Sequence, residues 1–175
     1  SGDHPPFIYS TDEGLTWTEV SGIDDDDRWQ DIIYADDKFV TVGFNGTRHS
    51  TDGINWGSGT GANSPRWYGV AYDGSGLWVA VAGLGTNRIM TSTDGINWTQ
   101  QPAPEQNEWR SVVYGNGIWV AVARTGTNRF MTSTDGTNWT LRSIDAVVDG
   151  LQWYNVEFWN GRFLAIGARS GSEDA

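Results

Sequence analysis

The sequence contains no cysteine, one lysine and two histidines among its 175 residues. The absence of cysteine excludes disulfide bonds and metal sites built on thiolates. No apolar run approaches the roughly 18 residues that a membrane-spanning helix requires. The 22 Asp and Glu outnumber the 11 Lys and Arg, and the formal net charge is −11. Such an acidic chain lacks the basic surface with which proteins bind nucleic acids and anionic membranes, so we expect neither partner and no membrane insertion.

Glycine and tryptophan are present in excess, with 23 Gly and 11 Trp. Glycine-dense sequence with many aromatic residues is typical of short strands joined by tight turns. Helical periodicity is absent, and the many glycines disfavour helix. The length suits one domain with a sizeable hydrophobic core.

A seven-residue motif recurs along the chain. Residues 50–56 read Ser-Thr-Asp-Gly-Ile-Asn-Trp, residues 92–98 are identical, and residues 133–139 differ only by Thr137 in place of Ile. A related motif with one additional residue occupies 10–17. The first serines, at 10, 50, 92 and 133, are 40, 42 and 41 residues apart. Regular spacing of this kind indicates a repeat protein.

Each complete repeat also contains a second signature, a Trp followed by alternating apolar residues, a tight turn and a short apolar run. The alternation predicts a strand, and Asp-Gly or Asn-Gly in the turns predicts hairpins. Four short antiparallel strands in about 40 residues are typical of one blade of a β-propeller.

We therefore predict an all-β fold, a four-bladed β-propeller in a single domain over 1–175. Three blades are expected at 28–62, 66–104 and 108–145. The last repeat, 152–170, holds only the first two strands, and residues 7–20 hold only the last two. The two ends are expected to pair in a fourth blade, which closes the ring and hides its edge strands. A monomer is favoured, and the rival is that the chain forms half of an eight-bladed ring made by two chains.

The motif Ser10-x-Asp12-x-Gly14-x-Thr16-Trp17 resembles the Asp box of the bacterial neuraminidase (BNR) repeat, and the other three motifs resemble it with one residue deleted. The resemblance implies a propeller in which these hairpins lie away from the ligand face. Their Asp side chains are expected to accept backbone N–H bonds within the turn, and their Trp side chains to wedge between strands. These structural residues are Asp12, Asp52, Asp94, Asp135, Trp17, Trp56, Trp98 and Trp139.

The resemblance does not imply that this protein is a sialidase. The enzymes that carry Asp boxes use about six blades, three arginines that converge on the substrate carboxylate, and a Tyr–Glu nucleophile pair. This chain shows no such arrangement, nor any nucleophile elbow, phosphate-binding loop or zinc-binding spacing. His4 and His49 each stand alone. The sequence favours a non-enzymatic role over an enzymatic one, and it identifies no catalytic residue.

The Trp that begins each repeat is expected near the face where propellers usually bind ligands. These residues are Trp29, Trp67, Trp109 and Trp153. Tyr68 and Tyr154 follow two of them, and the nearby guanidinium groups are those of Arg66, Arg88 and Arg129. Aromatic rings beside such donors suit sugar rings and their hydroxyls. The alternative is that the four Trp fill the core at the top of the ring.

Strand alternation places a second set of polar residues toward the central axis. Asp31, Asn155 and Glu157 share a face with the small residues Gly69 and Ser111. Two nearby carboxylates either take up a proton or share a hard cation such as Ca²⁺. Water in the channel is the alternative to a cation. Asp24–Asp27 also offers clustered carboxylates, although a solvated acidic loop accounts for them.

The sequence favours a non-enzymatic binding or structural module of a secreted, cell-surface or phage-tail protein, so an extracellular or virion-surface location is expected. Carbohydrate is the favoured ligand. Two alternatives remain open: a glycosidase-like enzyme that uses Asp31 and Glu157, and a protein-interaction platform.

Overall fold

The computed structural model describes residues 7–23, 28–62, 66–144 and 150–169. These residues form sixteen β-strands arranged in five antiparallel sheets, and no helix occurs among them. In this part of the chain there is accordingly no helix that could cross a membrane. The prediction of an all-β chain with four-stranded antiparallel sheets is confirmed.

Three sheets are complete, and in each the chain runs from the first strand to the fourth without a crossover. Sheet I holds β3 (Trp29–Ala35), β4 (Lys38–Gly43), β5 (Gly46–Ser50) and β6 (Gly57–Ser58). Sheet II holds β7 (Trp67–Tyr72), β8 (Trp78–Ala82), β9 (Ile89–Ser92) and β10 (Thr99–Gln101). Sheet III holds β11 (Trp109–Gly115), β12 (Ile118–Ala123), β13 (Phe130–Ser133) and β14 (Thr140–Arg142).

The two ends of the chain form half-sheets. The N-terminal half-sheet pairs β1 (Ile8–Tyr9) with β2 (Thr18–Glu19). The C-terminal half-sheet pairs β15 (Leu151–Trp159) with β16 (Arg162–Arg169). The first corresponds to the last two strands of a complete sheet, and the second to the first two.

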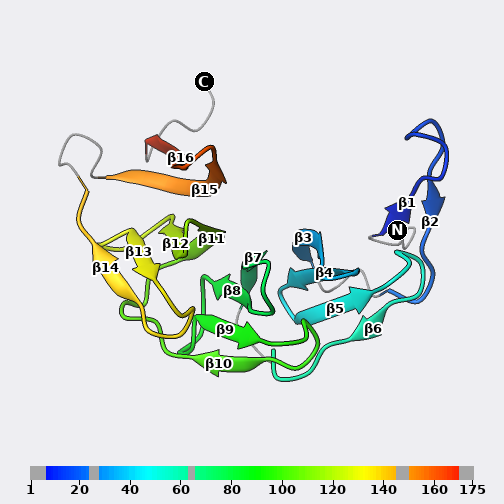
Figure 1. Ribbon diagram of the computed structural model, residues 1–175, viewed down its shortest axis with the longest axis horizontal. Coiled ribbons are helices and arrows are strands. Elements are labelled where there is room, and N and C mark those ends of the chain that lie inside the picture. Colours follow the sequence, from blue (N-terminus) through cyan, green and yellow to red (C-terminus); the bar gives the residue numbers. More distant parts are fainter. Residues whose placement is uncertain (1–6, 24–27, 63–65, 145–149, 170–175) are drawn as a thin grey trace.

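The sheets follow one another around an arc, with β3, β7, β11 and β15 on its inner side and β6, β10 and β14 on its outer side (Figure 1). Each inner strand contacts the inner strand of the next sheet. The hydrophobic core lies between consecutive sheets, where Trp67, Trp78, Trp109 and Trp119 are almost completely buried. A smaller cluster joins sheet III to β15 through Val122 and Val156.

The hairpin between the third and fourth strands is built on the same hydrogen bond in every repeat, in which the first Ser Oγ donates to the Asp Oδ1 at 2.7–2.9 Å. In the turn at 50–56, Asp52 Oδ1 accepts the backbone N–H groups of Ile54 and Asn55 at 2.9 and 2.7 Å. The Trp56 indole donates to the Gly53 carbonyl at 2.9 Å, and Gly53 has a φ of 73°, which glycine adopts without strain. We call the four turns, at 10–17, 50–56, 92–98 and 133–139, the serine–aspartate turns.

The predicted closure of the ring is not found in the described residues. There β1 pairs only with β2, and β16 pairs only with β15. The half-sheets lie at opposite ends of the arc (Figure 1). The physical reason is the stacking of the sheets: their orientation is set where inner strands contact, and that stacking leaves the arc open.

Candidate binding groove along the inner strands

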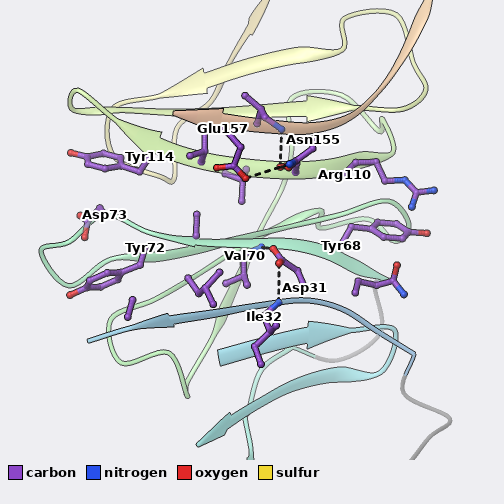
Figure 2. Close-up of a pocket in the computed structure, with 18 of the residues that line it drawn as sticks. Asp31, Ile32, Tyr68, Val70, Tyr72, Asp73, Arg110, Tyr114, Asn155 and Glu157 are labelled. Carbon is purple, nitrogen blue, oxygen red and sulfur yellow. Dashed lines mark hydrogen bonds between the residues drawn. The ribbon is translucent and has the colours of Figure 1, made fainter. Parts of the chain in front are cut away.

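A groove of about 750 Å³ runs along the inner strands β3, β7, β11 and β15. Its charged side chains are Asp31, Asp73, Arg110 and Glu157. Five phenol rings also line it, from Tyr34, Tyr68, Tyr72, Tyr114 and Tyr154. Figure 2 shows Tyr68 and Arg110 at one end, Tyr72, Tyr114 and Asp73 at the other, and Asp31, Asn155 and Glu157 between them.

One residue in each inner strand is displaced from regular pairing. The ladder between the first and second strands shifts register directly after the Trp that begins the sheet. Such a bulge turns a side chain away from the regular alternation of the strand. The four bulge residues, Gln30, Tyr68, Arg110 and Tyr154, all line the groove. The bulge is common to the four inner strands, whereas the side chain that it carries into the groove differs between them.

Arg110 is held in place by its neighbours. Its guanidinium group lies over the Tyr68 ring, 3.9 Å from the ring centre, and forms an ion pair with Glu108. Its Nε is buried and has no hydrogen-bond partner. Arg110 therefore presents a fixed cation whose charge is neutralised by Glu108, together with one donor that is not yet used.

Asp31 connects two sheets. Its Oδ1 accepts the backbone N–H of Ile32 at 2.8 Å, and its Oδ2 accepts that of Val70 on β7 at 2.9 Å. Burial raises the pKa of Asp31, the two amide hydrogen bonds oppose that rise, and the negative charge of Glu157 adds to it. Both carboxylate oxygens thus accept backbone hydrogen bonds, and the bond from Val70 joins sheet I to sheet II.

The equivalent residues of the following sheets form a similar connection. Ser111 Oγ accepts the backbone N–H of Val156 at 3.2 Å and donates to Asn155 Oδ1 at 2.8 Å. Asn155 Nδ2 lies 3.4 Å from Glu157 Oε1, and Glu157 is exposed. Asp31, Asn155 and Glu157 therefore line one groove, as strand alternation predicts.

A cation at these residues stays a prediction. No group of three or more His, Cys, Asp or Glu side chains that could hold a metal ion occurs in residues 7–23, 28–62, 66–144 and 150–169. The hydrogen bonds to Ile32 and Val70 give Asp31 a structural role without an ion. Asp24–Asp27, the other predicted cation site, lies outside the described residues.

The predicted aromatic platform is not formed by the four strand-starting Trp. Trp67 and Trp109 are completely buried, Trp153 is 9% exposed, and Trp29 is half-buried. The Trp67 indole donates to the Ala62 carbonyl at 2.9 Å inside the protein. Trp67, Trp109 and Trp153 fill the space between consecutive sheets, and Trp29 lines a smaller pocket beside Phe7.

The predicted arginines bind the protein itself. Arg88 Nη1 donates to the carbonyls of Gln106 and Asn107, and Arg129 donates to the carbonyl of Leu151. Each thereby fastens a loop of one sheet to the segment that leads into the next. Arg66 is exposed, and its guanidinium lies 4.7 Å from the centre of the Phe44 ring. None of the three is among the groove residues.

The four aspartates of the serine–aspartate turns also lie outside the groove. The side-chain and backbone hydrogen bonds of Thr16 lower the pKa of Asp12 to about 2. Those of Asn55 and Asn138 lower the pKa values of Asp52 and Asp135 further. The cause is local, because every donor is within four residues of its acceptor.

Sequence reasoning placed Tyr68 and Tyr154 near the ligand face but missed Gln30 and Arg110. The available signal was the position after each repeat-starting Trp, which holds Gln, Tyr, Arg and Tyr in an otherwise regular pattern. Without the bulge, strand alternation assigns this position to the core-facing side.

The arrangement of the sheets is similar to that of known propellers. A structure described as YCF48 bound to D1 peptide superposes on 95% of this chain with a TM-score of 0.63 and 12% sequence identity. The fold is a β-propeller. A structure described as a putative glycosidase from Bacteroides thetaiotaomicron superposes on 85% of this chain with a TM-score of 0.52 and 16% identity. No protein-family model matches the propeller chain, and no curated protein does.

This propeller chain spans only part of the structures to which it is similar. It covers 58% of the YCF48 chain and 63% of the putative glycosidase. It covers 55% of the computationally designed protein Ika8, on which 81% of this chain superposes with a TM-score of 0.50.

Proposed function

We propose that the chain is a non-enzymatic β-propeller binding module that holds a polypeptide segment with basic side chains in the groove of its inner strands. The observation that carries the proposal is the composition of the groove. The groove is lined by three carboxylates, those of Asp31, Asp73 and Glu157, and by one cation, Arg110, whose charge Glu108 already neutralises. A net charge of −11 adds a field that attracts cationic ligands.

The exposed tyrosine side chains of the groove are further support for a polypeptide ligand. Tyr154 is 43% exposed, and Tyr68 and Tyr72 are partly exposed along the same groove. Rigid rings with a polar tip are the side chains that proteins commonly use to bind peptides, since they contribute much contact area at little entropic cost. The YCF48 structure is described as bound to a peptide, and it supports this proposal by analogy of fold.

Carbohydrate, the ligand favoured by the sequence, becomes the second candidate. Its main support was the Trp platform, and those rings are buried. The amides of Gln30 and Asn155 beside Tyr154 still suit sugar hydroxyls. A glycosidase-like role finds less support, since both oxygens of Asp31 accept hydrogen bonds from backbone amides.

The type of the repeat and the location of the protein are part of the same proposal. We assign the serine–aspartate turns to the Asp-box type on the strength of their sequence and their repeated hydrogen bonds. A module of this kind fits a secreted, cell-surface or phage-tail protein. Its acidic surface and lack of cysteine are compatible with that location.

Binding of synthetic peptides tests the proposal. Fluorescein-labelled octapeptides that contain Lys and Tyr should raise the fluorescence anisotropy on addition of the protein, and the same peptides with Glu for Lys should not. Glu157→Lys should weaken binding about three- to tenfold, because it replaces an attractive charge with a repulsive one. Glu19→Lys makes the same change on the outer strand β2 and should leave the affinity unchanged.

A glycan array on the intact protein separates the two ligand classes. If the protein binds glycans but none of the Lys-containing peptides, carbohydrate rather than polypeptide is the ligand of the groove. Equal affinity for the Lys and Glu peptides would remove the electrostatic argument.

A further inference from the structure

Aromatic and guanidinium groups are stacked at the end of the groove where Figure 2 shows Tyr68 and Arg110. The Arg66 guanidinium lies 4.7 Å from the centre of the Phe44 ring. Phe44 meets Tyr68 edge-on, with 5.8 Å between the two ring centres. The Arg110 guanidinium lies 3.9 Å from the centre of the Tyr68 ring. Because the face of an aromatic ring attracts a guanidinium group, each of the two rings helps to hold one arginine in place.

Glu108 connects a third arginine to these groups. Its carboxylate pairs with Arg110, and its other oxygen lies 3.7 Å from Arg124 Nη1. Arg124 Nε donates to Gln152 Oε1 at 3.1 Å, and the same oxygen accepts the hydroxyl of the groove residue Tyr154 at 2.7 Å. We call the six connected residues the arginine stack: Phe44, Arg66, Tyr68, Glu108, Arg110 and Arg124.

The arginine stack is built from positions at which otherwise similar repeats differ. They are the residue before the strand-starting Trp, the bulge residue after it, and the first residue beyond the second strand. At the last of these positions, sheets I to III have Phe44, Gly83 and Arg124. A Cβ added at Gly83 would overlap the Tyr68 ring and Glu108 Cγ. The lack of a side chain at Gly83 therefore lets the stack continue from sheet II to sheet III.

The arginine stack carries a positive charge. Its three guanidinium groups and one carboxylate give a formal charge of +2. Glu108 neutralises Arg110, so the excess belongs to Arg66 and Arg124. Both are accessible, since Arg66 is exposed and the Arg124 side chain is 39% exposed. The stack thus reverses the sign of charge locally in a chain whose net charge is −11.

The rest of the groove carries the opposite charge. Asp31 and Glu157 line its middle, and Asp73 lies at the end away from the arginine stack (Figure 2). The backbone N–H groups of Ser75 and Leu77 donate to Asp73 Oδ1 at 2.7 and 2.9 Å, which fixes this carboxylate in its turn. The middle and far end of the groove therefore attract cations, whereas the arginine stack attracts anions.

The two charged regions are separated by the length of an inner strand. Tyr68 lies near the start of β7, and Asp73 directly follows its end. Five residues of strand place these positions about 16 Å apart. An extended polypeptide covers the same distance in about five residues, so one short segment along the groove meets both regions.

We propose that the groove holds its polypeptide in one orientation by binding two opposite charges: a ligand carboxylate at the arginine stack and a basic side chain at Glu157 and Asp73, about four or five residues away. This rests on the proposed function, in which a polypeptide with basic side chains lies in the groove, and adds the carboxylate, its spacing and the orientation. An acidic side chain and the terminal carboxylate of a chain offer the same chemistry to the arginines.

Capped peptides with paired charges test the spacing. Each peptide has one Lys and, one, three or five positions away from it, one Glu, and fluorescence anisotropy gives its affinity. With Glu five positions from Lys, binding should be about two- to fivefold tighter than with Gln in place of that Glu, as for a partly exposed ion pair. With Glu next to Lys, there should be no gain. A Gln peptide whose uncapped terminus supplies the carboxylate distinguishes a chain end from an acidic side chain.

Variants of the protein test which residues bind the carboxylate. Arg66→Gln with Arg124→Gln should abolish the gain from Glu and should not weaken the binding of the Gln peptide. Asp73→Asn should weaken both peptides by a similar factor, because it acts on their common Lys. Arg142→Gln on the outer strand β14 is the matched control and should change neither affinity. Circular dichroism should be the same for all variants, since the altered side chains are exposed or partly exposed.

Three results would overturn the proposal: equal affinities for the Glu and Gln peptides at every spacing, an equal gain at every spacing, and a gain that survives the loss of both arginines. Each of them leaves the preference for Lys over Glu peptides intact, so the proposed function would stand. If no Lys-containing peptide binds, the proposed function fails, and the orientation proposal fails with it.

Discussion

At the scale of the residue, tryptophan has two roles that depend on position within the repeat. The Trp that begins a complete sheet packs between sheets, as Trp67 does at 0% exposure. The Trp that ends a serine–aspartate turn packs against its own hairpin, and its burial depends on a neighbouring sheet: Trp98 is 5% exposed and Trp17, at the open end, is 58% exposed. The same residue type therefore contributes unequally to stability.

Truncation of these two Trp should separate the roles. Trp67→Ala should lower the free energy of unfolding by about 3–5 kcal/mol, because it leaves a cavity in a closed core. Trp17→Ala should cost much less, because most of that ring is already in water. Urea unfolding followed by circular dichroism measures both. Equal losses for the two variants would contradict the assignment of Trp67 to the core.

The serine–aspartate turns make stability depend on acid pH. Hydrogen bonds hold the pKa of Asp12 at about 2, below the value of 3.8 for a free Asp, and lower those of Asp52 and Asp135 as well. A carboxyl with a depressed folded pKa contributes its full stability above the unfolded pKa and loses it as pH falls through the folded pKa. These turns should therefore make the urea midpoint fall between pH 4 and pH 2.

A variant provides the control for this pH dependence. Asp52→Asn should be less stable than the unmodified protein at pH 7 and should show a smaller fall between pH 4 and pH 2, since one of the titrating groups is gone. An unchanged acid slope would mean that groups outside the turns cause the fall.

At the scale of the element, the inner strands are joined by side chains that accept amides of the next sheet. Asp31 does this for Val70 and Ser111 for Val156. Sheet II has Gly69 at the equivalent position, where an added Cβ would lie 3.0 Å from the Arg110 carbonyl oxygen and from Ser111 Cα. There the strands approach too closely for a side chain, so direct backbone contact replaces the hydrogen bond.

Removal of the Asp31 carboxylate tests the connection between sheets. Asp31→Ala should lower stability by about 1–3 kcal/mol, because the buried amide of Val70 loses its acceptor. Glu157→Ala removes a carboxylate from the same groove and should change stability little, since Glu157 is exposed. Chemical denaturation compares the two variants. If Asp31 instead acts mainly as a cation ligand, chelator should lower the melting temperature of the unmodified protein to that of the Asp31 variant.

At the scale of the whole molecule, the sheets follow one another around an open arc, and burial depends on having a neighbouring sheet (Figure 1). Ile32 on β3 is 52% exposed, whereas its equivalents Val70, Val112 and Val156, which pack against the preceding sheet, are 3%, 6% and 2% exposed. The core is therefore most complete around sheets II and III.

The sequence by itself determined the elements of this protein. Strand alternation, the Asn-Gly and Asp-Gly hairpins and the turns around Asp12, Asp52, Asp94 and Asp135 depend on residues within a few positions of one another, so a repeated motif is sufficient to place them. The same reasoning placed Asp31, Asn155 and Glu157 on one side of the inner strands. Local chemistry was enough for these features.

Only the tertiary structure decided which side chains the bulges bring into the groove and whether the arc of sheets closes. The bulge that brings Arg110 into the groove, the burial of Trp67, and the bonds of Asp31 to Val70 and Ser111 to Val156 arise where sheets stack. Those two bonds join residues 39 and 45 positions apart. Each repeat has nearly the same sequence whether its neighbour is present or absent, so local pattern cannot say how tightly the sheets curve. Curvature is set by the packing between sheets, and it left the arc open where the sequence had predicted a closed ring.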